Sequence, residues 1–171
     1  MWKIVSLIMA TGLVLSMMIT ACQPEPDAAP QVGKLAPEFQ LPSLEGEVVS
    51  FSGLWGNPVM LNFWATWCGP CRLEIPYIQE LHEEWRDKDL AVLTVNVGEN
   101  PSQVEEFMAQ NQLTFPVLLD VDGEVSTQYS VRGIPTTVFI DSEGVIRVIK
   151  VGAFSSKAAI ERDLSKIISL P

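Results

Sequence analysis

Two cysteines separated by two residues, Cys68 and Cys71, are the side chains of this 171-residue chain whose type and spacing suggest chemistry. They follow a short apolar run, residues 59–65, and precede a segment of helical periodicity, so they should open a helix that leaves a strand. Gly69 permits the tight turn, and Pro70 suits an early helical position. Free N–H groups at a helix N-terminus should lower the pKa of Cys68. The pattern predicts that Cys68 is a nucleophile and that Cys71 resolves a mixed disulfide.

A cysteine pair of this spacing also occurs in structural disulfides and in metal sites. A loop this short gains little stability from chain entropy, so a purely stabilising disulfide explains the spacing poorly. Zinc needs about four ligands, whereas the chain has one histidine, His82, and one further cysteine, Cys22. We therefore predict a redox-active disulfide and no metal or other cofactor. A copper carrier that binds through Cys68, Cys71 and His82 is kept as a rival.

The hydrophobic pattern predicts one mixed α/β domain around the cysteines. Short apolar stretches within residues 32–58 favour an N-terminal β-hairpin, and residues 141–144 favour a second hairpin turn. Short runs of apolar residues indicate five further strands, at 59–65, 90–97, 115–119, 136–140 and 145–151.

Three helices are predicted from the 3.6-residue spacing of apolar side chains. The first carries the cysteines, the second covers residues 102–111, and the third begins near Ser156. Ser102 and Glu105 are candidates for a capping box at the second helix. The first helix should bury an apolar face made of Leu73, Tyr77, Ile78, Leu81 and Trp85.

The N-terminal residues differ in composition from the rest of the chain. An uncharged apolar run, residues 4–21, follows Lys3 and ends at Cys22, and the sequence becomes polar and Pro-rich at once. This ending resembles a bacterial lipobox, which implies cleavage before Cys22 and lipid attachment to its sulfur; an uncleaved signal anchor is the alternative. We therefore divide the chain into a signal peptide (1–21), a flexible tether (22–31) and a folded domain (32–171).

The charge of the chain excludes several classes of partner. The full sequence has a formal net charge of −10, and removal of residues 1–21 takes away one lysine and no acid, which leaves −11. Such acidity disfavours nucleic acid and anionic lipid as partners. We expect a monomer that meets a protein substrate.

Four segments together resemble a known family. The segment NFWATWCGPCR (62–72) is similar to the active-site strand, turn and helix of thioredoxin-like proteins, and VRGIPTTVFID (131–141) is similar to their Pro loop. With VGKLAPEFQLPSLEG (32–46) and VNVGE (95–99), the chain resembles the membrane-tethered ResA/TlpA branch, whose domain is of the redoxin or AhpC-TSA type. This resemblance implies a thioredoxin-like fold, with a central mixed sheet flanked by helices and a helix and strand inserted within residues 100–120.

The resemblance also implies several site residues. Pro135 should be cis, which would set its loop beside the cysteines and free the backbone of Ile134 to pair with an extended substrate. Trp67 flanks the site and, with Gly69, Pro70 and Ile134, forms the expected docking surface.

One departure from the family of thioredoxins proper affects proton transfer. Where those proteins have a buried Asp before the cysteines, this chain has Asn62, which exchanges no proton at ordinary pH. Strand 90–97 should run parallel to strand 59–65, so that Glu99 lies at the same sheet edge as Cys68. Glu99 is therefore the candidate for assisting proton transfer at Cys71, and a glutamate at this place belongs to the site in the ResA/TlpA branch.

The implied function is reduction of protein disulfides in a bacterial cell envelope, with the domain on the extracytoplasmic side of its membrane. In the ResA-like branch the electron donor is a CcdA-type membrane thiol transporter and the usual substrate is the haem site of apocytochrome c. A peroxiredoxin is the other enzymatic rival. Its peroxide-binding pattern requires Pro and Thr before the cysteine, where Cys68 has Leu61 and Ala65.

Overall fold

The computed structural model describes residues 29–86 and 88–168 of the chain. The predicted signal peptide, the lipidation candidate Cys22 and most of the predicted tether therefore lie outside the described residues. Within the described ranges, no helix combines the length and the apolar character needed to cross a membrane.

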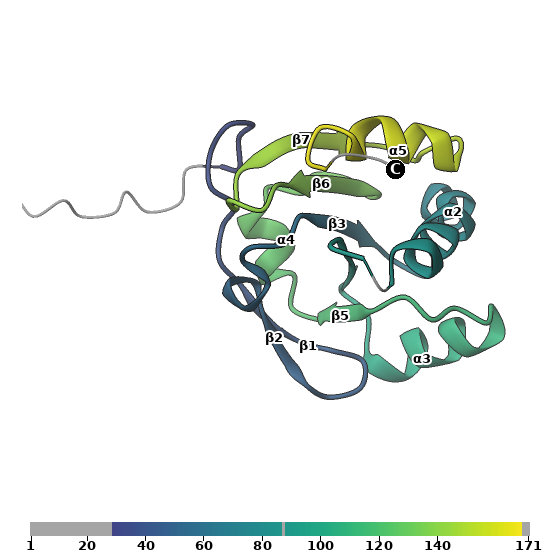
Figure 1. The fold of residues 1–171 in the computed structure, drawn as a ribbon. Coiled ribbons are helices and arrows are strands. Elements are labelled where there is room, and N and C mark those ends of the chain that lie inside the picture. Colours follow the sequence, from purple (N-terminus) through teal and green to yellow (C-terminus); the bar gives the residue numbers. More distant parts are fainter. Residues whose placement is uncertain (1–28, 87, 169–171) are drawn as a thin grey trace, which may run out of the picture.

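A five-stranded sheet of mixed direction forms the centre of the domain, as predicted (Figure 1). Its strand order is β5-β4-β3-β6-β7, with β3 and β5 parallel to β4, and with β6 antiparallel to both β3 and β7. The five predicted strands are confirmed with small shifts at their ends: β3 (Val59–Trp64), β4 (Ala91–Val97), β5 (Val117–Asp120), β6 (Thr136–Ile140) and β7 (Ile146–Val151).

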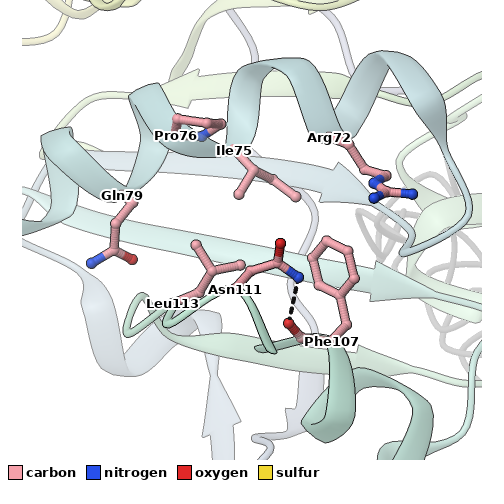
Figure 2. Close-up of a pocket in the computed structure, with 7 residues that line it drawn as sticks. All are labelled: Arg72, Ile75, Pro76, Gln79, Phe107, Asn111 and Leu113. Carbon is pink, nitrogen blue, oxygen red and sulfur yellow. Dashed lines mark hydrogen bonds between the residues drawn. The ribbon is translucent and has the colours of Figure 1, made fainter. Parts of the chain in front are cut away.

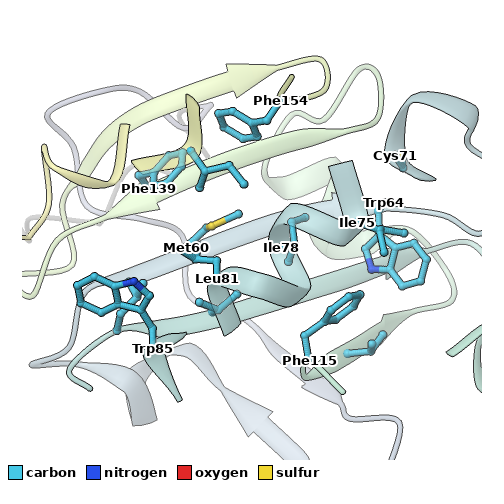
Figure 3. Packing of buried hydrophobic residues seen from close by; sticks show 14 of the residues in the cluster. Met60, Trp64, Cys71, Ile75, Ile78, Leu81, Trp85, Phe115, Phe139 and Phe154 are labelled. Carbon is cyan, nitrogen blue, oxygen red and sulfur yellow. The ribbon is translucent and has the colours of Figure 1, made fainter. Parts of the chain in front are cut away.

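Both faces of the sheet are covered, which is why β3 is buried at every position. Met60 and Trp64 point to the face that α2 (Gly69–Trp85), α3 (Pro101–Gln110) and α5 (Lys157–Leu164) cover. Figure 3 shows this cluster, with the α2 side chains lying against the sheet. Leu61 and Phe63 face the other layer, which contains 3₁₀-helix η1 (Phe51–Leu54) and α4 (Glu124–Gln128).

The predicted N-terminal hairpin is confirmed as a separate two-stranded sheet. Strands β1 (Gln40–Pro42) and β2 (Val48–Ser50) pair antiparallel. The Leu44 N–H donates to the Val117 carbonyl at 2.9 Å, so the hairpin is attached to the β5 edge of the main sheet. This contact covers an edge that would otherwise expose unpaired backbone groups.

Two local predictions for the helices were wrong, and one short helix was missed. Leu73 is 71% exposed, because the buried face of α2 is shifted by one position and includes Glu74 and Ile75 in its place. The capping box of α3 uses Asn100 and Gln103, since Pro101 already starts the helix. The short helix α4 was not predicted at all.

A single side chain explains how α4 begins. Both carboxylate oxygens of Asp120, at the end of β5, accept hydrogen bonds from the N–H groups of Val125 and Ser126, at 3.1 and 2.8 Å. These bonds satisfy donors that have no partner inside the helix. The sequence of residues 120–123 predicts a β-turn, and this turn is followed directly by the short helix.

Tyr129 fastens the N-terminal segment to this second layer. Its hydroxyl donates to the Pro37 carbonyl at 2.7 Å, and its ring contacts Phe39 and Phe63. Burial raises the pKa of Tyr129, and the nearby Glu38 carboxylate adds to the shift, so the phenol stays protonated and able to donate.

We expect Tyr129→Phe to lower the free energy of unfolding by about 1 kcal/mol, because it removes one buried hydrogen bond and leaves the ring packing intact. Urea denaturation followed by circular dichroism measures this loss. Tyr77→Phe is the matched control, since Tyr77 is half-buried and its hydroxyl has no partner among the described residues. Equal stability of the two variants would contradict the assigned role of the Tyr129 hydroxyl.

Candidate active site

The two cysteines lie where β3 ends and α2 begins, as the sequence predicted. Cys68 is the N-cap residue of α2, and Gly69 and Pro70 occupy the first helical positions. A disulfide joins Cys68 to Cys71, and the Cys71 N–H donates to the Cys68 sulfur at 3.2 Å. After reduction this N–H group would stabilise negative charge on the same sulfur.

The two sulfurs differ little in burial in the oxidised state. Cys68 is 4% exposed and Cys71 is fully buried. Trp67, directly before Cys68, is 70% exposed, which leaves its ring available to a partner. Trp64, by contrast, lies in the core. The pair is therefore reached from the side of Cys68 and Trp67.

The predicted cis bond before Pro135 is present, and it brings a second loop to the cysteines. The Ile134 carbonyl oxygen lies 3.6 Å from the Cys68 sulfur. The Thr136 hydroxyl donates to the Gly133 carbonyl at 2.7 Å and holds the loop in shape. Within the described chain the Ile134 N–H donates no hydrogen bond, so this backbone can pair with an extended peptide.

Glu99 lies at the predicted sheet edge, but its carboxylate is bonded to the loop before the cysteines. It accepts hydrogen bonds from the Thr66 N–H at 2.7 Å, the Thr66 hydroxyl at 2.5 Å and the Asn96 side-chain amide at 2.8 Å. The geometry therefore gives Glu99 a positioning role for the residues that precede Cys68. Its assistance in proton transfer at Cys71 stays a prediction.

Glu74 is the site residue that the sequence interpretation missed. It lies one helical turn after Cys71 on the same face of α2 and is fully buried. The Asn62 amide donates to one carboxylate oxygen and the Phe154 N–H donates to the other, each at 2.8 Å. The sequence did contain a signal for this residue, because an acid stands three positions after Cys71 and next to the apolar Ile75.

The surroundings of Glu74 act on its protonation in opposite directions. Burial raises the pKa of this carboxyl and is the larger effect, whereas the hydrogen bonds from Phe154 and Asn62 and the charge of Lys150 lower it. Asn62 also donates to the Thr137 hydroxyl at 2.9 Å, which links Glu74 to β6. Glu74 is thus a buried carboxyl that is hydrogen-bonded to the Asn62 side chain behind the cysteines.

A hollow of about 350 Å³ borders the site between α2 and α3. Figure 2 shows Arg72, Ile75 and Gln79 of α2 along one wall and Phe107 and Leu113 along the other. The Arg72 guanidinium lies 5.8 Å from the centre of the Phe107 ring. The insertion that the sequence placed within residues 100–120 therefore shapes the surface next to the cysteines.

The geometry rejects the copper site considered above. His82 follows Cys71 by eleven residues within α2, which corresponds to roughly 16 Å along a helix axis. Ligands of one metal ion lie about 2 Å from it. Cys68, Cys71 and His82 therefore do not converge on one ion.

Comparisons with known proteins agree with this site. The AhpC/TSA family model matches residues 32–149. The thiol-disulfide oxidoreductase ResA of Oceanobacillus iheyensis is 43% identical over 129 residues, which cover 73% of this chain and 67% of that protein. The thioredoxin-like protein YneN of Bacillus subtilis is 44% identical over 130 residues, covering 74% of this chain and 75% of the relative.

A solved structure of similar fold is a thiol:disulfide interchange protein of the thioredoxin family from Chlorobium tepidum. It is 29% identical, with a TM-score of 0.71, and the alignment covers 82% of this chain and 98% of the other. The chain therefore belongs to the AhpC/TSA family, has the thioredoxin-like fold and is a thiol-disulfide oxidoreductase of the ResA type.

Proposed function

We propose that the chain reduces disulfides of partner proteins on the extracytoplasmic side of a bacterial membrane, to which lipid on Cys22 anchors it. The observation that carries the reductase assignment is the position of Cys68, at the start of α2 and 3.6 Å from the Ile134 carbonyl. This arrangement combines an activated sulfur with a free strand-like backbone. A disulfide-bonded peptide that pairs with Ile134 would present its sulfur to Cys68.

The reaction then proceeds in two exchanges. The reduced Cys68 thiolate attacks one sulfur of the partner disulfide, forms a mixed disulfide and releases the other partner sulfur as a thiolate. Cys71 gives up its proton and attacks the Cys68 sulfur. This second step restores the Cys68–Cys71 disulfide and frees the partner as a dithiol.

Glu74 is the proposed acceptor of the Cys71 proton. A buried carboxyl of raised pKa lies closer to a thiol in proton affinity than an ordinary glutamate does. The hydrogen bonds from Asn62 and Phe154 stabilise its charged form after transfer.

The finer assignments rest on the resemblance to the ResA/TlpA branch. They comprise the haem site of apocytochrome c as substrate and a CcdA-type transporter as electron donor. An envelope location fits the apolar run of residues 4–21 and the adjacent Cys22. A membrane-held donor explains the tether, because the enzyme must be reduced again in oxidising surroundings.

We expect Cys71→Ala to leave Cys68 linked to its substrate in cells, because the mixed disulfide has lost its resolving thiol. Mass spectrometry of the trapped species then identifies the substrate, and its C-x-x-C-H peptide is the expected partner. Cys68→Ala is the control and should trap nothing. Capture of unrelated proteins only would contradict a specific reductase.

We expect Glu74→Gln to remove a pH dependence of stability. Because the folded-state pKa is raised, the native protein holds this proton above pH 4.5, and stability falls as the pH rises from there toward the folded-state pKa. A tenfold difference in proton affinity between the folded and unfolded states corresponds to about 1.4 kcal/mol. Urea unfolding between pH 4.5 and 8 should show this decline in the native chain and a flatter profile in the variant; equal slopes would reject the assignment.

Glu99→Gln separates positioning from proton transfer. If Glu99 only holds Thr66, the variant should slow resolution of the mixed disulfide by the same factor at every pH. A proton-transfer role instead changes the shape of the pH–rate profile. We expect the first result, with stopped-flow measurement of the second exchange as the readout, and expect the changed profile for Glu74→Gln.

A further inference from the structure

The hollow between α2 and α3 has a size and a lining that suit side chains of a partner protein. Its volume of about 350 Å³ is at the lower end of the roughly 300–1000 Å³ that ligand pockets have, so it holds one or two side chains. We call it the α2–α3 groove and define it by Arg72, Ile75 and Gln79 on one wall and Phe107 and Leu113 on the other. Figure 2 shows Arg72 and Gln79 at its two ends.

The α2–α3 groove begins one helical turn from the reactive sulfur. The Arg72 N–H donates to the Cys68 carbonyl at 3.1 Å, and the Arg72 side chain is exposed. Ile75 follows three residues later in the same helix. A partner that is joined to Cys68 through a disulfide therefore reaches the groove directly along the surface of α2.

The walls of the groove are apolar and are held in place by hydrogen bonds. Ile75 is only 5% exposed, whereas Phe107 and Leu113 are half-buried and leave part of their surface open. The Gln79 side chain accepts a hydrogen bond from the Thr114 N–H at 2.9 Å and donates to the Thr114 hydroxyl at 2.8 Å. These two bonds tie α2 to the segment that carries Leu113, so the groove is formed before a partner binds.

Arg72 is the one charged residue that lines the groove. Its guanidinium lies 5.8 Å from the centre of the Phe107 ring. Among residues 29–86 and 88–168, this guanidinium makes no ion pair and no hydrogen bond. Its N–H donors therefore stay available to a carboxylate, which a guanidinium binds with two parallel hydrogen bonds.

Acidic side chains stand around the groove but do not line it. Glu83 accepts a hydrogen bond from Gln79 at 2.7 Å, which places this acid at the end away from Cys68. Glu99, at the cysteine end, is 5% exposed and bonded to Thr66. The other acids of the two helices are also outside the lining: Glu74, Glu80, Glu84, Glu105 and Glu106. A partner residue near Arg72 thus meets a cation, whereas one that passes Gln79 meets an acid.

The spacing along α2 predicts which partner residues reach the groove. At 1.5 Å per residue, Arg72 lies roughly 6 Å and Ile75 roughly 10 Å beyond Cys68 along the helix axis. An extended peptide rises about 3.3 Å per residue, so its second residue from the reacting cysteine reaches Arg72 and its fourth reaches the apolar walls. The second and fourth side chains of an extended chain point to the same side.

We propose that the α2–α3 groove binds the substrate segment next to the reacting cysteine. An acidic side chain two residues from that cysteine pairs with Arg72, and a large apolar side chain two residues further contacts Phe107 and Leu113. This inference rests on the reductase function proposed above and adds the class of substrate. The preferred substrates are disulfide-bonded proteins that carry an acidic and then an apolar residue beside the reacting cysteine.

The test measures how fast the reduced full-length chain reduces synthetic peptides that contain a C-x-x-C disulfide. In a single turnover, two electrons pass from the Cys68–Cys71 dithiol to the peptide disulfide. Each rate is corrected for the background of the Cys68→Ala chain and divided by the rate of the same protein with the neutral bis(2-hydroxyethyl) disulfide. This division removes changes in the reactivity of Cys68 itself.

Two parent peptides carry Asp at the second and Leu at the fourth position, one of them before and the other after the disulfide ring. We expect one parent to react about three to five times faster than its version with Lys in place of Asp. It should react roughly ten times faster than its version with Ser in place of Leu.

Matched variants of the protein assign these preferences to the groove. Arg72→Glu should reverse the preference for Asp over Lys, whereas Arg86→Glu, the same change at the other end of α2, should keep it. Leu113→Ala should reduce the preference for Leu over Ser. Leu54→Ala should not, because Leu54 is a half-buried leucine of the opposite layer.

The outcomes separate this inference from the proposed function. Equal normalised rates for the parents and their Lys and Ser versions overturn the groove as a substrate site and leave the reductase function standing. A chain that reduces no peptide above the Cys68→Ala background overturns both proposals. A dimer in analytical ultracentrifugation that Arg72→Glu dissociates would assign the groove to a second copy of the chain, and it also overturns the inference.

Discussion

The direction of β6 is the constraint on which the active site depends. Because β6 runs antiparallel to β3, the loop before β6 meets the end of β3, and the cis Pro135 therefore lies beside Cys68. Strand β4 lies on the other side of β3 and runs parallel to it, so Glu99, which follows β4, reaches the same edge. Three segments that are distant in sequence thus converge at the start of α2, where helix N–H groups already favour a negative sulfur.

Behind the cysteines, the interface between β3 and α2 contains a polar contact in an otherwise apolar layer. A buried carboxyl is costly unless its oxygens are bonded, and both oxygens of Glu74 are. Two N–H donors favour the anion, whereas burial favours the acid and is the larger effect, so the pKa of Glu74 is raised. A carboxyl of raised pKa suits a group that takes up and returns a proton during each exchange.

Local sequence patterns predicted most of the helices and strands. They failed where contacts between distant residues determine whether a side chain is buried. The apolar run of β3, the hairpin turn before Ile146 and the start of α5 near Ser156 each follow a local rule, and each was predicted. Glu74 was missed because an acid among apolar residues reads as solvent-exposed until Asn62 and Phe154 are known to face it. Leu73 was assigned to the core because an apolar residue at helical spacing reads as buried, although the structure leaves it exposed.

The two ends of the sheet differ in how much of the adjoining backbone is left unpaired. At the cysteine end, the Ile134 backbone and Trp67 are left open, as an enzyme that binds a disulfide-bonded chain requires. At the tether end, the backbone of residues 33–36 is paired with the β6–β7 hairpin, so this segment is fixed to the domain and offers few unpaired backbone groups to a partner.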